Sequence, residues 1–359
     1  MGHYRKQIMT FVMSEDCNMA CRYCYSRETM CGNYRTLSLD FAYAALDDYI
    51  KAGNTAIRFF GVGEATMEPK KMKQIWVRAK ELVGDKLYTE VQTNGTFSEN
   101  VCEDISDIAD FVWISCDGTP DIQDQQRIMK DGTKSSSIIE RNIKKIQKKG
   151  KKVGIRATIS GLNLYRQKEM IDYFISLGIE CAFSDLICLP IMKGNGIYGI
   201  SGEDYVAEFI KAKRYAESKK FFYSNFYMVN FDEPVSISCR CMIPMPHLMP
   251  SGYVSACDMV TDVTNSLLDV MLYGKYDSKK NIIVYDNDKV EQIKKRKIEN
   301  LAACANCFVR EYCAGGCAGE AINETGDFYG IKEYLCDITK ALAKEFGVNY
   351  GQLFPYLHP

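Results

Sequence analysis

The stretch Cys17-Asn-Met-Ala-Cys21-Arg-Tyr-Cys24-Tyr25 decides how this sequence is interpreted, because it brings three cysteines together in a C-x3-C-x2-C spacing. A cubane 4Fe–4S cluster normally takes four thiolates. Three closely spaced thiolates therefore predict a cluster with one iron left open to a further ligand. The alternatives are three structural cysteines or a zinc site, although zinc prefers paired C-x2-C spacings.

The composition of the 359 residues is that of an ordinary globular protein, with 47% hydrophobic and 25% charged residues. The formal net charge of −1 provides no electrostatic attraction for nucleic acid or for a membrane surface. No apolar run approaches the ~20 residues of a membrane span, and the start of the chain has no export signal. We therefore expect a cytoplasmic protein with neither nucleic acid nor a membrane as partner.

The sixteen cysteines are too many to be incidental, and their spacing separates disulfide from metal chemistry. A reducing compartment keeps thiols free, so grouped cysteines in a cytoplasmic chain indicate metal ligands. Eleven of the sixteen fall into two groups, within residues 17–24 and 239–336. The other five are expected to be small buried hydrophobic residues: Cys31, Cys102, Cys116, Cys181 and Cys188.

Up to about residue 219, six short apolar runs alternate with amphipathic helical stretches. This alternation predicts parallel strands joined by right-handed crossovers. Six units are too few for a closed eight-stranded barrel, so we predict an α/β fold, a partial (βα)6 TIM-type barrel. The expected strands are Gln7–Met13, Ala56–Phe60, Leu87–Gln92, Phe111–Ser115, Val153–Ile159 and Glu180–Ile187.

The three-cysteine loop directly follows the first expected strand, and in such folds the chemistry lies at the carboxyl ends of the strands. After about residue 219 the periodicity fails, and prolines interrupt the sequence. We expect metal ligands, rather than a large apolar core, to organise this second part of the chain.

The cysteine motif resembles that of the radical S-adenosylmethionine (SAM) superfamily, and Tyr23 matches the aromatic residue before its third cysteine. In that family the open iron binds the amino and carboxylate groups of SAM, and one electron cleaves SAM to a 5′-deoxyadenosyl radical. The resemblance implies that Cys17, Cys21 and Cys24 bind a 4Fe–4S cluster. It also implies an external electron donor such as flavodoxin or ferredoxin.

Further motifs follow the next strands in the order that the family has them. Gly61, Gly63 and Glu64 stand in a segment that resembles the G-G-E-P motif, which receives the SAM amino group. Val62 and Ala65 depart from that motif. Taken alone, this stretch would be an ordinary loop.

Two segments after the third and fourth strands complete the resemblance. Asn94 belongs to a T-N-G-T element that faces the cofactor in the family, although an Asn-Gly turn is its simpler interpretation. Ser115, Asp117 and Arg127 resemble the S-x-D-G-P…R pattern, whose serine and acid contact the methionyl or ribose part of SAM. Arg156, inside the fifth strand, is expected to contact the SAM carboxylate or to pair with a buried acid.

The second cysteine group resembles the SPASM extension of radical SAM enzymes, which carries two auxiliary 4Fe–4S clusters. A pair of zinc sites is the alternative. The resemblance implies three 4Fe–4S clusters in all, with a radical SAM barrel over 1–219 and a SPASM domain over 220–359. The first auxiliary cluster would take Cys241, Cys257 and Cys317, with Cys239 as candidate fourth ligand. The second would take Cys304, Cys307, Cys313 and Cys336.

The role of Cys239 depends on the local backbone. Residues two apart on an extended chain point to opposite faces, so Cys239 and Cys241 can bind one cluster only across a turn. Without Cys239, the first auxiliary cluster would have an open iron for substrate.

In size and layout the chain is similar to anaerobic sulfatase-maturing enzymes and compact maturases of ribosomal peptides. In the sulfatase-maturing group an aspartate directly after an auxiliary-cluster cysteine is a candidate proton acceptor, and Asp258 stands there in this sequence. A turn acid is the simpler interpretation of Asp258. With 16 residues before Cys17, we expect no amino-terminal leader-recognition domain.

The resemblance implies oxidative modification of a peptide or protein side chain, as a thioether or carbon–carbon crosslink. The alternatives are formylglycine formation in a sulfatase, dehydrogenation of a small molecule, and an iron–sulfur electron carrier without radical chemistry. An electron carrier needs no open iron, so the three-cysteine motif favours the enzymes.

Overall fold

The computed structural model describes residues 7–24, 34–186, 200–260 and 266–349. In this part of the chain the strands form one sheet in the order β11-β10-β9-β8-β1-β2-β3-β4-β5-β6-β7. The first seven along the chain are β1 (Met9–Val12), β2 (Ala56–Phe60), β3 (Tyr88–Thr93), β4 (Phe111–Ser115), β5 (Lys152–Ile159), β6 (Cys181–Leu186) and β7 (Phe222–Ser224). The others are β8 (His247–Leu248), β9 (Tyr253–Ser255), β10 (Leu272–Asp277) and β11 (Ile282–Tyr285).

Strands β1 to β7 pair in parallel, which confirms the predicted α/β partial barrel. Each of the six expected strands is present, and the ends differ by at most two residues where both can be compared. Ile187 lies outside the described residues. The sequence did not reveal β7, because its three residues are too short to show a period.

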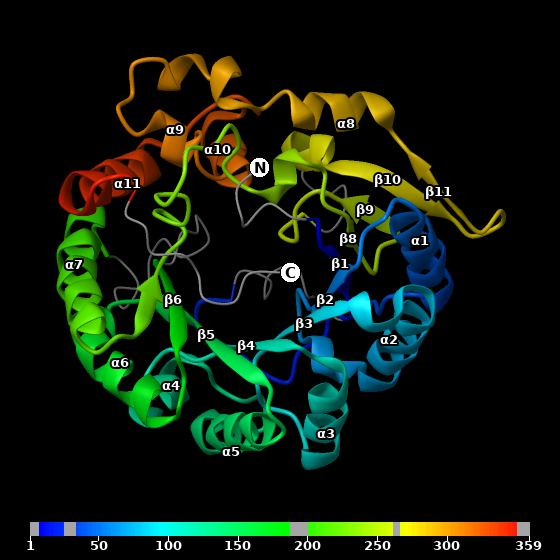
Figure 1. Cartoon of the computed structure of the whole chain (residues 1–359), viewed down its shortest axis with the longest axis horizontal. Helices are drawn as coiled ribbons and strands as arrows, with labels where there is room; N and C mark the ends of the chain where they lie inside the picture. Colours follow the sequence, from blue (N-terminus) through cyan, green and yellow to red (C-terminus); the bar gives the residue numbers. More distant parts are fainter. Residues whose placement is uncertain (1–6, 25–33, 187–199, 261–265, 350–359) are drawn as a thin grey trace.

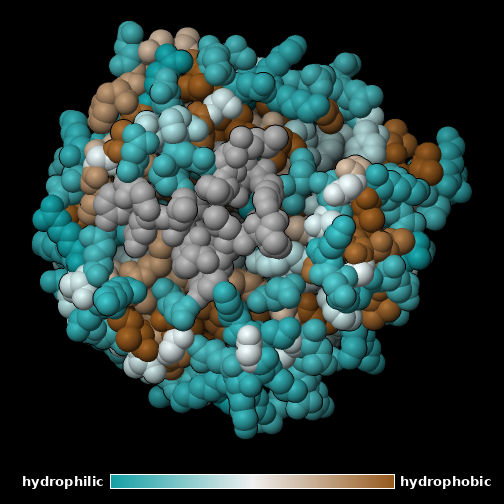
Figure 2. All heavy atoms as spheres, viewed as in Figure 1, coloured by the Kyte–Doolittle hydropathy of each residue, from teal (hydrophilic) through white to brown (hydrophobic). Residues whose placement is uncertain are grey.

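The helices cover the outer face of the curved sheet (Figure 1). Serine side chains cap the amino ends of α1, α3 and α7, while Pro69 and Pro120 begin α2 and α4. The barrel helices are α1 (Leu39–Lys51), α2 (Pro69–Val83), α3 (Glu99–Ile108), α4 (Pro120–Gln126), α5 (Ser135–Lys148), α6 (Gln167–Ser176) and α7 (Gly202–Ser218). Figure 2 shows that their outer rim is mostly hydrophilic.

The second part of the chain extends the same sheet. Strand β8 pairs in parallel with β1, joining His247 to Thr10 in register, and β9, β10 and β11 follow in antiparallel order. Its helices occupy the gap between α7 and α1 in Figure 1, with α11 against α7 and β11 beside α1. They are α8 (Asn287–Lys294), α9 (Arg310–Cys313), α10 (Ala318–Thr325) and α11 (Glu333–Phe346).

The expectation that metal ligands rather than an apolar core organise the second part is wrong. The main buried cluster runs through both parts and includes Phe231, Leu248, Val254 and Leu342. Prolines and very short strands conceal this core, because a two-residue strand has no readable alternation. The division of the chain at residue 219 remains a prediction.

The cysteines outside the two groups are buried, as expected, wherever the structure describes them. Cys102, Cys116 and Cys181 are all buried, whereas Cys31 and Cys188 lie outside the described residues. Among the helices that the structure describes, none has the length and apolar character needed to cross a membrane.

Candidate functional site

The three-cysteine loop lies at the carboxyl end of β1, as the sequence predicts. Cys17, Cys21 and Cys24 are all partly buried. Burial raises the pKa of Cys17 to about 12 and that of Cys21 to about 11, and the neighbouring thiols of the loop contribute to both shifts. The three sulfur atoms are therefore electrostatic neighbours. A metal must displace their protons to bind.

Backbone hydrogen bonds hold this loop from two sides. On the β2 side, the carbonyl oxygen of Asp16 accepts from the amide of Glu64 at 2.7 Å. On the α4 side, the amide of Ala20 donates to the carbonyl of Ile128 at 2.7 Å, and the amide of Arg22 donates to the carbonyl of Gln126 at 3.0 Å. The loop is fixed by the strand ends around it, which suits a cluster site that must keep its geometry.

The glycines after β2 are required by space. A Cβ atom at Gly63 would lie 2.1 Å from the carbonyl oxygen of Asp16, and one at Gly61 would lie 2.6 Å from the amide nitrogen of Ala65. No side chain fits at these distances. Val62, which departs from the family motif, packs with Val12 and other buried apolar residues, so the second glycine of the motif is not needed here.

Glu64 links the loops that follow β1, β2 and β3. Its buried carboxylate accepts from the hydroxyl of Thr93 at 2.6 Å, the amide of Asn94 at 2.7 Å and the amide of Thr66 at 2.9 Å. Burial raises the pKa of Glu64 above its usual range, and these donors oppose the shift. Asn94 in turn donates to Asn18 at 2.8 Å, beside Cys17. A contact of Glu64 with a SAM amino group remains a prediction.

Tyr23 of the cysteine loop forms a buried cluster with Asp117 and Arg127. The hydroxyl of Tyr23 donates to Asp117, and Nε of Arg127 lies 3.0 Å from the same carboxylate oxygen. The other oxygen accepts from the amide of Thr158 at 2.9 Å. Burial opposes a charge on Arg127, but Asp117, Tyr23 and Cys21 raise its pKa overall. Asp117 thus has internal partners, and its contact with SAM remains a prediction, as does that of the neighbouring Ser115.

Arg156 pairs with an acid inside the barrel, as one of the two interpretations of this residue expects. Its Nη2 atom lies 3.3 Å from Asp185, and its guanidinium lies 4.3 Å from the ring centre of Phe226 and 5.5 Å from that of Phe183. Register places Arg156 beside Ser115 on β4. A quarter of the Arg156 side chain stays exposed in this pair. Its contact with a SAM carboxylate, the other interpretation, remains a prediction.

The first auxiliary group of cysteines comes together around a turn. Residues Arg240–Met242 form one turn of 3-10 helix, and the amide of Met242 donates to the carbonyl of Cys239 at 3.2 Å. This turn brings Cys239 within hydrogen-bonding reach of Cys241, which together with burial raises the pKa of Cys241. Cys257 and Cys317 raise it further. The turn that the sequence required for Cys239 is present, and its role as a ligand remains a prediction.

The second auxiliary group lies around η9 (Ala302–Cys304) and α9. Burial raises the pKa of Cys313 to about 12, with contributions from Cys336, Cys304 and Cys307. Burial likewise raises the pKa of Cys336 to about 11. The eleven grouped cysteines therefore form three electrostatic neighbourhoods. Which cluster each thiol binds remains a prediction.

Among the described residues, no three His, Cys, Asp or Glu side chains are spaced to hold one metal ion. A cubane cluster holds each thiolate on a different iron, so its ligands stand farther apart than those of a single ion. The grouped cysteines are free thiols, and free thiols are the donors that such clusters require.

Asp258 connects the first auxiliary group to the barrel interior. Its Oδ1 atom lies 3.9 Å from the sulfur of Cys257. Its charge acts on Arg156 from β5 and on His247 from β8. The carboxylate therefore lies beside an auxiliary cysteine and acts on charged residues of the barrel strands, and its role as a proton acceptor remains a prediction.

His247 is a residue that sequence reasoning missed. It is buried, and its Nδ1 lies 3.1 Å from the carbonyl of Met245 and 3.3 Å from that of Ser255. Two carbonyl acceptors require a proton on Nδ1, which leaves Nε2 as an acceptor in the neutral ring. Burial lowers the pKa of His247. A lone histidine on a two-residue strand gives no sequence signal.

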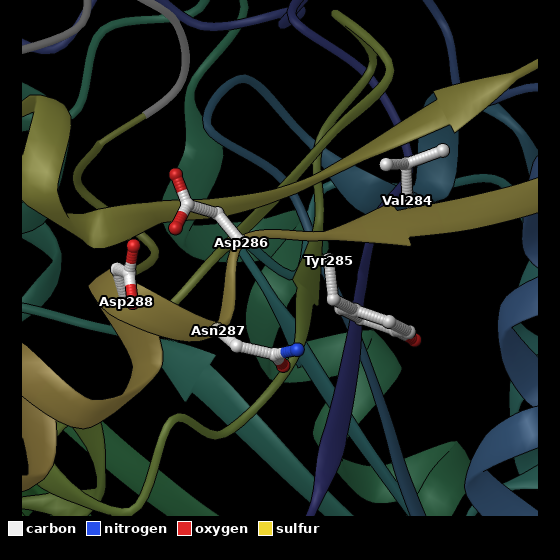
Figure 3. A pocket seen from close by; sticks show the side chains of 5 residues that line it. All are labelled: Val284, Tyr285, Asp286, Asn287 and Asp288. Carbon is white, nitrogen blue, oxygen red and sulfur yellow. The ribbon is translucent and has the colours of Figure 1, made fainter.

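A surface depression lies away from these groups, at the junction of β11 and α8. It is lined by residues 284–288, whose side chains Figure 3 shows. No cysteine lines it, so it is not the centre of the chemistry.

Comparison with known proteins assigns the first part of the chain. Residues 11–176 match the Radical SAM superfamily. This region is a radical SAM domain. It contains the cysteine loop and all of the strand-end motifs described above, whose roles at the site remain predictions.

Solved structures resemble nearly the whole chain. The anaerobic sulfatase-maturing enzyme anSMEcpe with bound AdoMet is 18% identical, with a TM-score of 0.75 over 94% of this chain and 96% of its own. SuiB from Streptococcus suis, bound to S-adenosylmethionine, is 15% identical, with a TM-score of 0.64 over 93% of this chain and 77% of its own. At these identities the likeness shows a shared fold.

One curated relative matches part of the chain. The Fe-coproporphyrin III synthase of Methanosarcina barkeri is 28% identical over 162 residues, which are 45% of this chain and 39% of the relative. The chain thus spans about two fifths of that relative's length.

Replacing Gly63 by alanine should impair the radical SAM domain. The added Cβ would force the Asp16 backbone away and shift the cysteine loop. A misplacement of about 1 Å costs on the order of 10²-fold in rate, so we expect a loss of that size in 5′-deoxyadenosine formation. Gly53→Ala is the control, because no atom lies within 4 Å of its added Cβ, and the strain of an alanine at its φ of +86° falls at the amino end of β2, opposite the cysteine loop. Normal SAM cleavage in Gly63→Ala would contradict the close approach.

Proposed function

We propose that this protein is a SPASM-type radical SAM enzyme that oxidatively modifies a side chain of a peptide or protein. The observation that carries the proposal is the juxtaposition of Asp258 with both an auxiliary cysteine group and the barrel interior. An electron carrier has no use for a carboxylate between an auxiliary cysteine group and the charged residues of the barrel strands. The fold shared with anSMEcpe and with SuiB, which were also solved with a Cp18Cys peptide and with the precursor peptide SuiA, supports a peptide substrate.

In this proposal the two parts of the chain divide the work. Residues 1–219 would hold SAM on Cys17, Cys21 and Cys24, and residues 220–359 would hold the two auxiliary clusters. When bound, SAM and the three clusters supply a radical that removes hydrogen from an unactivated carbon and a path for the electron that the product loses. The protein contributes orientation and exclusion of water.

The residues of the barrel interior define what can enter. The ion pair of Arg58 with Glu90, at 2.7 Å, and that of Arg156 with Asp185 provide polar contacts. Phe111, Trp113 and other buried aromatic residues form an apolar cluster beside Arg156. Such a mixed lining suits an uncharged or partly polar side chain presented by a peptide backbone. Asp258 would take the proton that the oxidised carbon releases.

Maturation of a sulfatase is the second candidate, because the shared fold with anSMEcpe is nearly complete and Asp258 follows an auxiliary cysteine. A small-molecule dehydrogenase is the third. The gene neighbourhood separates them, since a peptide maturase should lie beside a short reading frame and the second candidate beside a sulfatase.

The deciding experiment is incubation of the reconstituted, reduced protein with SAM and the peptides encoded beside its gene. Flavodoxin or ferredoxin would serve as electron donor, and the thiol chemistry suits the reducing cytoplasm. A mass loss of about 2 Da per product, for the two hydrogens removed in a crosslink, supports the peptide maturase. SAM cleavage that no peptide or sulfatase segment stimulates would count against both protein substrates.

The auxiliary cysteines should be needed for product but not for SAM cleavage. Replacing Cys304 and Cys307 together by alanine should abolish product if electrons leave through the auxiliary clusters, while 5′-deoxyadenosine still forms. The control is Cys102→Ala, which removes a buried thiol outside the groups. Equal loss of SAM cleavage in a folded double variant would indicate a structural role, because metal binding and folding are coupled in such domains.

A further inference from the structure

Arg296 is a fully buried cation in the auxiliary part of the chain. It lies just after α8, and its exposed fraction is 0%. Among the described residues it is the largest completely buried side chain. Burying a charge without a partner is strongly unfavourable. The surroundings of Arg296 must therefore contain what compensates its charge.

Neutral carbonyl groups hold the guanidinium in place. Its Nε donates to the carbonyl of Phe328 at 2.7 Å, and its Nη2 donates to Gly330 at 2.9 Å and to Gly315 at 3.3 Å. Three backbone acceptors on separate loops fix the side chain without neutralising it. Within the described ranges, no carboxylate forms an ion pair with Arg296, and its Nη1 has no hydrogen-bond partner.

The charges that act on Arg296 come from cysteines of both auxiliary groups. Cys239, Cys241 and Cys317 belong to the first group and Cys304 to the second, and each raises the pKa of the guanidinium against the lowering effect of burial. The guanidinium is therefore an electrostatic neighbour of both groups at once. Thiolates and anionic clusters at these positions would be the counter-charge that the fold lacks.

Gly315 leaves room beside the unpartnered Nη1. A Cβ at this position would lie 3.4 Å from Nη1 and 2.2 Å from Cδ1 of Leu301, and φ is +80°. Any side chain at Gly315 would thus collide with the packing of Leu301 and crowd the guanidinium. Gly315 also stands two residues before Cys317, so Nη1 lies beside the loop that carries a ligand candidate.

We propose that Arg296 is a positioning residue that sets the reduction potential of the auxiliary clusters, with Nη1 donating toward the cluster side of the Cys317 loop. This inference rests on the proposed function, because it requires that clusters bind at the auxiliary cysteines. A fixed positive charge favours the reduced, more negative state of a nearby cluster. Arg296 would therefore make the auxiliary clusters better acceptors for the electron that the product loses.

The test compares Arg296→Gln, which removes the charge, with Arg296→Lys, which keeps it. Arg214→Gln is the matched control, because Arg214 is 65% exposed and pairs with Glu345 at the surface. Iron content and the auxiliary-cluster potentials, followed by electron paramagnetic resonance during redox titration, are measured without substrate. We expect Arg296→Gln to lower the ratio of reduced to oxidised auxiliary cluster at a fixed potential about tenfold, which is a fall of about 59 mV in the potential of a one-electron couple. Arg296→Lys and Arg214→Gln should stay close to wild type.

The outcomes separate the inference from the proposed function. Unchanged potentials in an iron-loaded Arg296→Gln, or equal shifts in the Gln and Lys variants, would overturn the role of the charge while the enzyme assignment stands. A wild-type protein that binds only about four irons, the content of one cubane, would overturn both. If Arg296→Gln loses auxiliary iron, the test uses wild-type protein labelled with 15N-arginine instead. Electron paramagnetic resonance then looks for a magnetic coupling between an arginine nitrogen and a reduced auxiliary cluster. A coupling that is present in the wild type and lost in Arg296→Lys supports the inference, and its absence from the wild type overturns it.

Discussion

Replacing Cys17, Cys21 and Cys24 together by alanine is expected to abolish SAM cleavage and to remove about a third of the bound iron. The wild-type protein should load roughly twelve irons per chain, from three cubane clusters of four. The barrel loop contributes one of the three neighbourhoods, and the auxiliary cysteines lie on separate elements. Their iron should therefore remain when the loop loses its ligands.

The matched control removes the same number of thiols outside the groups. Cys102, Cys116 and Cys181 are buried among apolar residues, so their replacement by alanine should cost some stability and leave about twelve irons, the content of three cubanes. Iron analysis and the yield of 5′-deoxyadenosine measure both effects. A loop variant that still cleaves SAM would refute the cofactor assignment, and one that loses all iron would mean that the three sites do not load independently.

The sequence predicts the barrel well because its signals are local. The runs Ala56–Phe60 and Phe111–Ser115 are strands with the predicted bounds, since buried parallel strands are short, apolar and bounded by turn residues. The cysteine loop is also predictable, because its spacing alone specifies its chemistry. Residues far apart in sequence needed the structure.

The partners of charged side chains are the part that sequence could not supply. Arg156 is visible as a charge within a strand, but its ion pair with Asp185 depends on the register of β5 and β6. Arg296 stands in a lysine-rich stretch and looks like an exposed residue of a charged helix end. Its burial follows from loops around Gly315 and Gly330 that fold over it, and no local pattern reports such packing.

The turn at Cys239 illustrates the same limit at shorter range. The spacing of Cys239 and Cys241 left two backbone conformations open, and only the extended one would separate their side chains. The 3-10 turn over Arg240–Met242 brings them together. Whether both bind iron decides if the first auxiliary cluster has an open site. Loss of auxiliary iron in Cys239→Ala, with the barrel cluster intact, would identify a fourth ligand.

Asp258→Asn is expected to reduce product formation by roughly 10²–10⁴-fold, the usual contribution of a general base. The amide keeps the shape of the carboxylate and removes its capacity to accept a proton. SAM cleavage should continue, because Asp258 lies beside the first auxiliary group rather than in the loop of Cys17, Cys21 and Cys24. The variant should therefore uncouple radical formation from product.

The ratio of product to 5′-deoxyadenosine measures this uncoupling, with the iron content checked alongside. Asp85→Asn serves as control, because the Asp85 side chain is fully exposed in the 3-10 turn Gly84–Lys86, between α2 and β3. An unchanged ratio in Asp258→Asn would make the residue a turn acid and would leave the proton to another acceptor. His247 is then the next candidate, because its Nδ1 is held by two carbonyls and Asp258 already acts on its charge. A ratio that falls only in His247→Gln would transfer the role of base to the imidazole.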